Sequence, residues 1–297
     1  MAALAAVGQN IIVGKTYRLL KRIGEGSFGK IFQANKKEKE KEKEKDDNKN
    51  ELYAVKINTQ EHTQVFQNEV QILTKLQGLK NIPSLYAFGT EGKFNYLVME
   101  LLEQSVEELQ KSYGKNMPLK IVLHLGLQML AIIESIHLQG IIHRDIKPAN
   151  FLLKTNTQGI SNLYLIDFGL STFFLDETMD KKHIPFSHQE RLIGTKKYMS
   201  VNVGKNMTAS RRDDLESLGY ILMHMQQAEQ VQAEQVQAEQ VQAEQVQAEQ
   251  EQEQAEQDEC NIGEFIIFVK YCQGLKFDAI PNYDYLRTLL TNLNKII

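Results

Sequence analysis

The segment HRDIKPAN places an aspartate, a lysine and an asparagine within six positions. Asp145 could orient a hydroxyl group and accept its proton, Lys147 could neutralise charge on a phosphoryl group, and Asn150 could bind a magnesium ion. Asp167 follows the apolar run LYLI, where its carboxylate could hold magnesium between two phosphate groups. Phosphoryl transfer needs positioning and charge neutralisation without a protein nucleophile, so these residues are candidates for that chemistry.

An upstream segment, GEGSFGKI, places Gly24, Gly26 and Gly29 in the spacing GxGxxG. Glycines at this spacing allow backbone N–H groups to approach a phosphate, although the pattern alone also fits a simple glycine hairpin. A dinucleotide-binding fold would begin a helix here, whereas KIFQAN continues as a strand and supplies Ile31 two residues after the last glycine. The segment favours a phosphate site only when the other motifs are counted with it.

Lys56 lies in the strand-like run YAVKI, and Glu69 lies in the amphipathic segment that follows it. The ammonium group could pair with the α- and β-phosphates of a nucleotide, and the carboxylate could hold the ammonium group in place. A lysine on a strand or a glutamate on a helix is usually a solvated side chain. The order and spacing of the two residues after the glycines favour a role at the same site.

The elements that must position these residues are mostly predicted strands before Leu102 and predicted helices after it. Before it, short β-branched or aromatic runs predict strands at YRLLKRI, KIFQAN, LYAVKI, PSLYAF and FNYLVME, and residues 64–76 have helical spacing. After it, apolar periodicity predicts helices at residues 118–137, 214–225, 264–272 and 283–293. The sequence therefore predicts an α+β fold of two lobes. They are a small antiparallel β-rich N-lobe with one main helix, about residues 13–100, and a larger, mostly helical C-lobe, about residues 103–297.

Two segments are expected to lie outside the cores of both lobes. Residues 36–50 alternate charge and contain no apolar residue, which predicts a solvated loop between two strands. Residues 226–260 repeat QAEQV and hold ten acidic side chains but no Lys or Arg. The five-residue period rotates successive valines by roughly 140° around a helix, so no coiled coil is predicted. An exposed single helix and a disordered tract are equal alternatives for this insert.

Composition argues against several classes of protein. The formal net charge of −4 and the pI of about 6.0, without a clustered basic stripe, predict no nucleic-acid partner. Cys260 and Cys272 form no CxxC pair, so neither a disulfide framework nor a zinc site is expected. No targeting segment and no membrane span are expected, which favours a cytoplasmic or nuclear protein. The oligomeric state leaves no signal in the sequence.

The motifs together resemble those of eukaryotic protein kinases, and more narrowly those of the casein kinase 1 family. The resemblance is carried by HRDIKPANFL, LIDFGLS, GTKKYMSVN, SRRDDLESLGYIL and PNYDYLRTLL, in a kinase domain expected at residues 17–297. Ser200, Val201 and Asn202 stand where most kinases have Ala-Pro-Glu, which is a casein kinase 1 trait. The resemblance implies a two-lobed kinase that transfers the γ-phosphate of Mg-ATP to protein serine or threonine hydroxyls, with Lys147 supporting the serine/threonine class.

The resemblance also assigns roles to matching positions. The catalytic set would be Asp145, Lys147, Lys56, Glu69 and Thr195, and the Mg²⁺ ligands would be Asn150 and Asp167. The ATP-binding set would be Ile23, Gly24, Glu25, Gly26, Ser27, Phe28, Gly29, Lys30, Ile31, Ala54, Lys56, Met99, Glu100, Leu102, Leu152 and Ile166. Asp214 is similar to the helix aspartate that binds the backbone of the catalytic loop.

Members of this family prefer a phosphate or an acidic residue three positions before the target hydroxyl, which implies acidic or pre-phosphorylated protein substrates. Lys197, with Arg191 nearby, is the candidate contact for that anion. The tract at 226–260 replaces a docking loop and helix of the family, and its acidic charge could repel such substrates. The alternative is a pseudokinase or scaffold of the same fold, although the catalytic lysine and aspartates that such proteins usually lack are present here.

Overall fold

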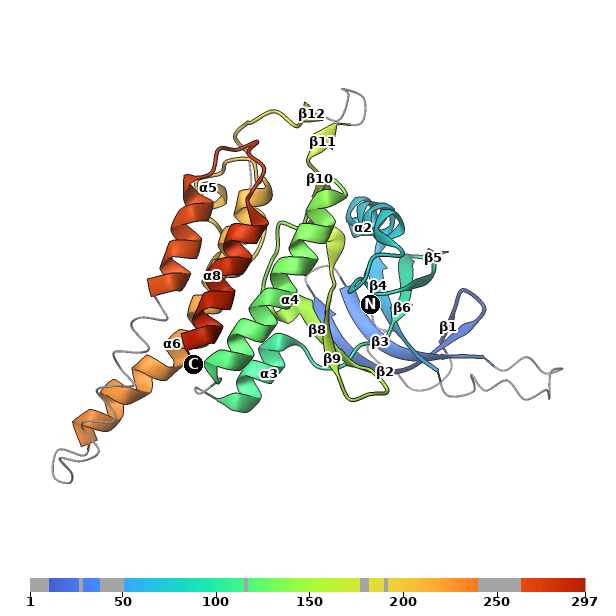
Figure 1. Ribbon diagram of the computed structural model, residues 1–297. Helices are drawn as coiled ribbons and strands as arrows, with labels where there is room; N and C mark the ends of the chain where they lie inside the picture. The colour runs from blue at the N-terminus through green and yellow to red at the C-terminus, as the bar shows by residue number, and fades with distance from the viewer. Residues whose placement is uncertain are drawn as a thin grey trace. The chain divides into compact units, whose positions relative to one another are not determined.

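The computed structural model describes residues 11–26, 29–37, 51–114, 117–176, 182–189, 192–239 and 263–296. These residues form two compact units. The first runs to Glu103 and includes the short segment Ile166–Gly169, and the second contains Gln104–Leu165 and the described residues from Leu170 onward. The β-rich first unit and the mostly helical second unit confirm the predicted α+β fold (Figure 1). Most of the charged insert at 36–50 lies outside the described residues.

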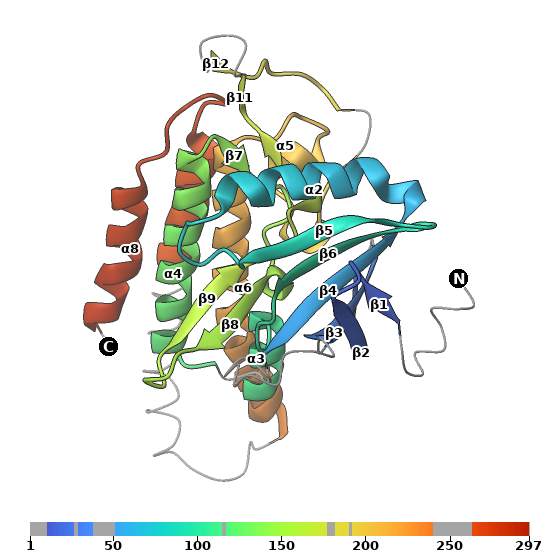
Figure 2. The same cartoon turned by 90° about the vertical axis from the view of Figure 1, so that its right-hand side faces the viewer.

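The first unit is built on a six-stranded antiparallel sheet with the strand order β1-β2-β3-β4-β6-β5 (Figure 2). Its strands are β1 (Ile12–Val13), β2 (Tyr17–Gly26), β3 (Gly29–Lys36), β4 (Leu52–Thr59), β5 (Leu85–Glu91) and β6 (Phe94–Glu100). Alternating apolar side chains of these strands form one buried cluster that includes Tyr17, Phe32, Tyr53 and Val98. The five predicted strands are present, and β1 is additional.

Helix α2 (Thr63–Leu76) follows the 3₁₀ turn η1 (Gln60–His62) and confirms the predicted helix at 64–76. The apolar residues that recur at helical spacing are buried: Phe66, Ile72, Leu73 and Leu76. Glu69 is buried with them, which is rare for a glutamate without a partner. The helix thus brings one carboxylate to its packed face.

The described residues of the second unit form helices and three short strand pairs. The helices are α3 (Val106–Tyr113), α4 (Leu119–Leu138), α5 (Val201–Gly204), α6 (Arg211–Glu239), one at residues 263–274 and α8 (Tyr283–Ile296). The antiparallel pairs are β7 (Ile141–Ile142) with β10 (Thr172–Phe173), β8 (Phe151–Thr155) with β9 (Ser161–Leu165), and β11 (Leu175–Asp176) with β12 (Lys182–His183). The four predicted C-lobe helices are all present.

Helix α3 was not predicted, although the sequence carries its start signal. The side chain of Ser105 accepts a hydrogen bond from the backbone N–H of Glu108, and the Glu108 carboxylate accepts one from the backbone N–H of Ser105. This reciprocal capping box satisfies two N–H groups that a helix start otherwise leaves unpaired. The helix is short and mostly polar, so its apolar periodicity is too weak to indicate it.

Helix α4 is the central helix of the second unit. It packs against both α6 and α8. By length and composition it is the one described helix that could cross a membrane, with a mean hydropathy of 1.7 over its most apolar window, of which 56% is buried. Burial against two neighbouring helices is typical of a core helix, and such helices pass the same test of composition.

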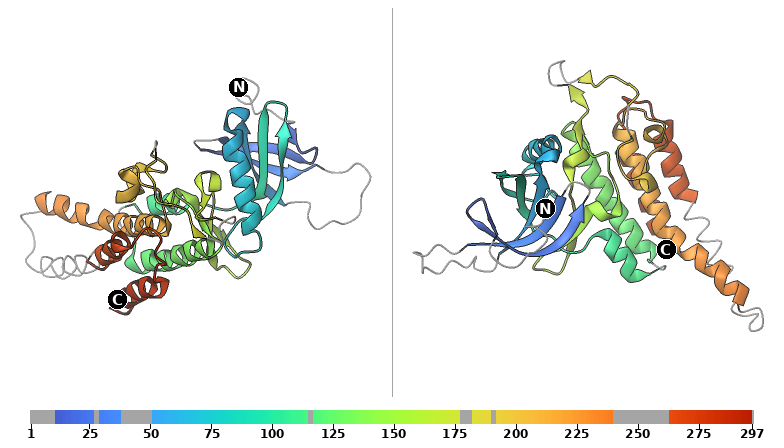
Figure 3. Two further views of the ribbon diagram at one scale, coloured as in Figure 1. Left: turned by 90° about the horizontal axis from the view of Figure 1, so that it is seen from above. Right: turned by 180° about the vertical axis from the view of Figure 1, so that it is seen from behind.

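Helix α6 is longer than the predicted helix at 214–225, because it continues to Glu239 and extends past the helices it packs against (Figure 3). The first part of the QAEQV tract is therefore helical, in keeping with the helix propensities of Ala, Glu and Gln. Residues 240–262 lie outside the described residues, so the choice between helix and disorder stays open there.

Gly219 on α6 allows close packing of the helix at 263–274. A Cβ atom at Gly219 would lie 2.5 Å from Cγ2 of Val269 and 3.2 Å from Cδ1 of Phe268. We expect Gly219→Ala to lower the free energy of unfolding by about 1 kcal/mol in urea, because overpacking costs ~1–3 kcal/mol and alanine regains only ~1 kcal/mol of helix propensity. Gly204→Ala is the control, since a Cβ there meets nothing within 4 Å. Equal stability of the two variants would contradict the expectation.

Candidate active site

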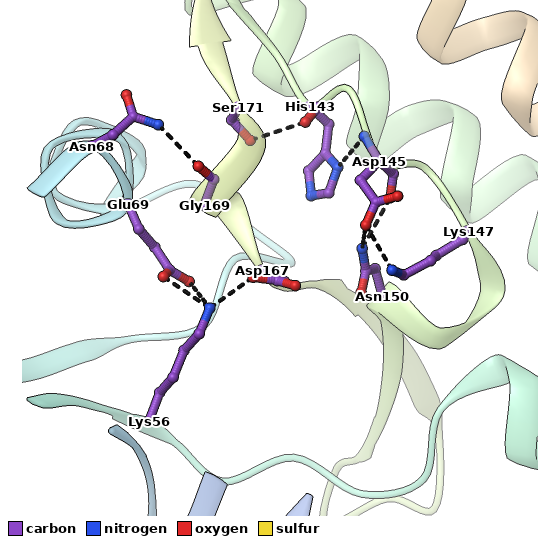
Figure 4. A network of polar contacts seen from close by, with 10 residues as sticks. All are labelled: Lys56, Asn68, Glu69, His143, Asp145, Lys147, Asn150, Asp167, Gly169 and Ser171. Atoms are coloured by element: carbon purple, nitrogen blue, oxygen red, sulfur yellow. Dashed lines mark hydrogen bonds and ion pairs between the residues drawn. The ribbon is translucent and has the colours of Figure 1, made fainter. Parts of the chain in front are cut away.

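Lys56, Glu69 and Asp167 form an ionic cluster in the first unit (Figure 4). The Nζ atom of Lys56 lies 2.8 Å from both carboxylate oxygens of Glu69 and 2.7 Å from Oδ1 of Asp167. The side chains of Lys56 and Glu69 are 7% and 1% exposed, whereas that of Asp167 is 30% exposed. One ammonium group thus bridges a buried carboxylate and a more accessible one.

The sheet and α2 fix this cluster from two elements. Lys56 lies on β4, where it is paired with Ile31 of β3 and Leu97 of β6, so its backbone is held on both sides. Burial alone would lower the pKa of Lys56, but the Glu69 and Asp167 carboxylates outweigh burial and hold the pKa above its usual range. The ammonium group therefore stays charged at physiological pH, as pairing with phosphates requires.

The turn of Asp167, Phe168 and Gly169 has a strained backbone and packs against α2. The φ angle of Asp167 is 65°, in the left-handed region that costs a non-glycine residue on the order of 1 kcal/mol. Nδ2 of Asn68 donates to the backbone oxygen of Gly169 at 3.4 Å, and a Cβ atom at Gly169 would lie 3.0 Å from Cγ1 of Val65. Strain of this kind persists where surrounding contacts enforce it, which is frequent at functional sites.

A second cluster, in the second unit, is centred on Asp145 (Figure 4). Nζ of Lys147 donates to Oδ2 of Asp145 at 2.6 Å, and Oγ1 of Thr195 donates to Oδ1 at 2.7 Å. Nζ of Lys147 also donates to Oγ1 of Thr195 at 3.2 Å, which closes a ring of contacts. Both oxygens of the Asp145 carboxylate are therefore held, and its orientation is fixed.

Asn150 belongs to the same cluster and supports its backbone. Its Nδ2 donates to the backbone oxygen of Asp145 at 2.9 Å and lies 3.3 Å from Oδ2 of the same residue. Because the amide nitrogen is used inside the loop, the amide oxygen is the atom through which Asn150 would bind a metal ion. An oxygen ligand of this type suits Mg²⁺.

Gly194 lets the segment that carries Thr195 approach the Asp145 loop. Its φ angle is 103°, and a Cβ atom there would lie 2.6 Å from the backbone oxygen of Arg144. Further along, Oγ of Ser200 donates to Oδ1 of the buried Asp213 on α6 at 2.6 Å. The segment from Gly194 to Ser200 is thus fixed at both ends, which holds Thr195 against the Asp145 carboxylate.

Asp214 on α6 holds the backbone that leads to Asp145. Its Oδ2 and Oδ1 accept hydrogen bonds from the backbone N–H groups of His143 and Arg144, at 2.7 and 2.9 Å. Arg144 has a φ angle of 66°, so these bonds stabilise another left-handed residue. Burial would raise the pKa of Asp214, but hydrogen bonds from His137 and from the His143 backbone help to lower it. Its contribution to stability is therefore present at neutral pH and lost only as pH falls through that lowered pKa.

The predicted glycine segment forms the β2–β3 hairpin, in whose register Gly26 pairs with Gly29. A Cβ atom at Gly29 would lie 2.4 Å from the backbone oxygen of Ile57, so only glycine fits this position. The two strands also carry the predicted residues Ile23, Gly24, Glu25, Lys30 and Ile31. Ser27 and Phe28 lie outside the described residues, and their predicted role stays a prediction.

The other predicted ATP-binding residues fall in both units. In the first, Met99 on β6 is paired with Ala54 on β4, and Ile166 belongs to the short segment that ends with Gly169. Glu100 is the last residue of β6, and Leu102 lies two residues further along the chain. Leu152 lies on β8 of the second unit. The binding roles of all these residues stay predictions, and Arg191 lies outside the described residues.

Several supporting residues were not predicted from the sequence. Asn68 contacts the Asp167 turn, and Nε2 of His137 donates to Oδ2 of Asp214 at 2.9 Å. Gly194 opens the segment GTKKYMSVN, but no role was assigned to it there. His137 lies 77 positions from Asp214 in the chain, so no local pattern could reveal that contact.

Comparison with known proteins agrees with the motifs and the geometry. A protein kinase domain matches residues 17–278. The chain is 35% identical over 290 residues to casein kinase I homolog 1 of Schizosaccharomyces pombe. That alignment covers 96% of this chain but 63% of the yeast protein, so this chain spans less than two thirds of that relative's length. These matches confirm the resemblance, and the chain belongs to the protein kinase family as a casein kinase 1-like member.

Proposed function

We propose that this protein is a serine/threonine kinase that transfers the γ-phosphate of Mg-ATP to protein hydroxyl groups. The contacts around Asp145 carry the proposal, because Lys147 and Thr195 hold its carboxylate in one orientation. A carboxylate held in this way takes the hydroxyl proton while the hydroxyl oxygen bonds to phosphorus and the bond to the ADP oxygen breaks. Lys147 then neutralises charge on the transferred group.

Residues of both clusters fit the nucleotide and Mg²⁺ that protein kinases generally use. Lys56 would pair with the phosphates, and Asp167 and Asn150 offer the oxygen ligands that Mg²⁺ prefers. The described part of the chain has no group of three or more His, Cys, Asp or Glu residues suited to a metal ion. The phosphates would therefore supply much of the coordination, as is usual for Mg²⁺, and the bound ion would neutralise their charge.

We further propose that the substrates are acidic or already phosphorylated near the target. Lys197 is exposed two residues after Thr195, its Nζ contacts Nε2 of His224, and it lies 5.3 Å from the centre of the Tyr198 ring. Burial and the charge of Lys197 lower the pKa of His224, so the imidazole is neutral at pH 7. Lys197 is then a cation that this surface presents to an anionic substrate.

Three matched peptides test this function. The first carries a serine in an acidic sequence, the second adds phosphoserine three residues before it, and the third replaces the target serine with tyrosine. With Mg-ATP we expect phosphate incorporation into both serine peptides and none into the tyrosine peptide. The second, primed peptide should have a kcat/KM about ten-fold higher than that of the first peptide, which corresponds to ~1.4 kcal/mol. Phosphorylation of tyrosine alone, or of none of the peptides, would overturn the proposal.

The role of Lys197 is tested with the same peptides. Lys197→Ala should reduce the advantage of the primed peptide to about two-fold or less, since a hydrogen bond to a charged group contributes ~1.5 kcal/mol. Lys205→Ala is the matched control, because Lys205 is also exposed and lies at the end of α5. If Lys197→Ala keeps the full advantage of the primed peptide, this residue is not the anion contact. The proposal that the protein is a kinase would still hold in that case.

A further inference from the structure

Tyr283, at the first position of α8, is half-buried and begins a chain of contacts that runs through two buried side chains, His137 and Asp214, toward the Asp145 loop. Its hydroxyl oxygen lies 2.7 Å from Nδ1 of His137 on α4. Nε2 of the same histidine lies 2.9 Å from Oδ2 of Asp214 on α6. The side chains of His137 and Asp214 are 1% and 3% exposed, so water cannot readily replace the contact between them. Three helices of the second unit are therefore joined through one imidazole.

The chain of contacts ends on the backbone of the Asp145 loop. Asp214 accepts the N–H groups of His143 and Arg144, the two residues that immediately precede Asp145. Arg144 has the left-handed φ angle of 66°, a conformation that its neighbours must enforce. A change in how the Asp214 carboxylate is oriented would therefore move the backbone on which Asp145 is carried.

The chemistry of the three groups assigns their protons. Burial raises the pKa of the Tyr283 phenol, so its hydroxyl keeps its proton. The Asp214 carboxylate, which already receives two backbone N–H groups, can only accept, so Nε2 of His137 must be the donor in that pair. In the neutral imidazole with a proton on Nε2, Nδ1 is an acceptor, and the Tyr283 hydroxyl is the donor that faces it.

We propose that Tyr283 is a positioning residue for catalysis: its hydroxyl selects the His137 tautomer that donates to Asp214 and thereby fixes the Asp145 loop. This inference rests on the proposed kinase function. The hydroxyl group, and not the ring, carries the role. The ring centre of Tyr283 lies 6.0 Å from that of His137, and a phenylalanine would keep this packing while removing the donor.

Tyr283→Phe therefore isolates the hydroxyl, and Tyr285→Phe is the matched control. Tyr285 lies two residues further along α8 and is 39% exposed. We expect Tyr283→Phe to lower kcat about five- to ten-fold, the effect of losing one hydrogen bond of ~1–1.4 kcal/mol. The KM values for ATP and peptide should change by less than about two-fold, because the substrate-binding residues are untouched. Tyr285→Phe should match the unmodified protein in both parameters.

Nitrogen-15 NMR of the His137 side chain provides a readout that a purely structural role would not change. In the unmodified protein we expect a pyridine-like Nδ1 and a pyrrole-like Nε2, and in Tyr283→Phe we expect both nitrogens to shift toward an average of the two tautomers. Urea unfolding of both variants shows whether a loss of activity merely follows a loss of stability.

The outcomes separate this inference from the proposed function. An unchanged His137 spectrum in Tyr283→Phe, or a kcat equal to that of Tyr285→Phe, overturns the role of Tyr283. If the unmodified protein transfers no phosphate, the proposed function has failed, and the His137 spectrum still decides whether the Tyr283 hydroxyl selects the tautomer. A kcat loss with an altered spectrum, in a variant that the urea curve shows to be fully folded under the assay conditions, supports the inference.

Discussion

Lys56→Met is expected to reduce phosphate transfer by about 10²–10³-fold, the usual effect of removing one preorganised electrostatic partner of the reacting group. It should also lower the free energy of unfolding by about 3 kcal/mol. The ammonium group bridges Glu69 and Asp167 at 2.7–2.8 Å, and the Glu69 side chain is 1% exposed. Methionine fills a similar volume but leaves the buried carboxylate without its counter-charge. Steady-state kinetics and urea unfolding measure the two effects.

The double variant Lys56→Met/Glu69→Gln separates stability from activity. Because glutamine is neutral, it removes the uncompensated charge that Lys56→Met creates, so at least half of the lost stability should return. Activity should not return, since no cation is restored to pair with the phosphates. If the double variant is as unstable as Lys56→Met, the ionic cluster is not the source of the stability effect. If Lys56→Met alone keeps full activity, its assigned role is wrong.

Asp145→Asn is expected to lower kcat by about 10³-fold, within the range that a positioned general base contributes. Asparagine has the same shape, but it cannot take a proton, and its NH₂ group would face one of the donors on Lys147 and Thr195. The KM for ATP should change little, because the substitution removes none of the groups assigned to the nucleotide, such as Lys56 and the glycine hairpin. Initial rates at varied ATP and peptide concentrations provide both values.

Asp284→Asn is the matched control for this substitution. Its side chain is 92% exposed on α8 and pairs only with a neighbouring arginine of the same helix among the described residues. A surface pair of this kind contributes little, so its kinetics should equal those of the unmodified protein. A ten-fold rise in the KM for ATP with an unchanged kcat in Asp145→Asn would show that Asp145 acts in binding rather than in proton transfer.

Local patterns were sufficient for much of the fold and for the residue types of both clusters. The spacing of apolar residues in 64–76 predicted α2 and also placed Glu69 on its buried face. HRDIKPAN fixed three members of the second cluster because they lie within one short loop. Helix α3 was missed because its signal is a capping box and its apolar periodicity is weak. Helix α6 was predicted only for residues 214–225, and the repeat that follows was left open between helix and disorder because its apolar residues have no helical periodicity.

Contacts between distant residues could not be predicted from spacing. Thr195 meets Asp145 across 50 positions, and Tyr283 meets His137 across 146. Thr195 was assigned only through the family resemblance, and Tyr283 not at all, because a tyrosine in an amphipathic helix is an ordinary core or surface residue. The strained φ angles of Arg144 and Asp167 were equally hidden, since they depend on partners that fold against them.

The most direct test of the central claim is a balanced transfer assay with the full chain. The protein is incubated with Mg-ATP and the acidic serine peptide, and ADP and phosphoserine peptide are both quantified over time. We expect the two products to appear in equal amounts, with Asp145→Asn slower by about 10³-fold. ADP without phosphopeptide would show hydrolysis in place of transfer. No product above the Asp145→Asn control would contradict the account and favour a pseudokinase.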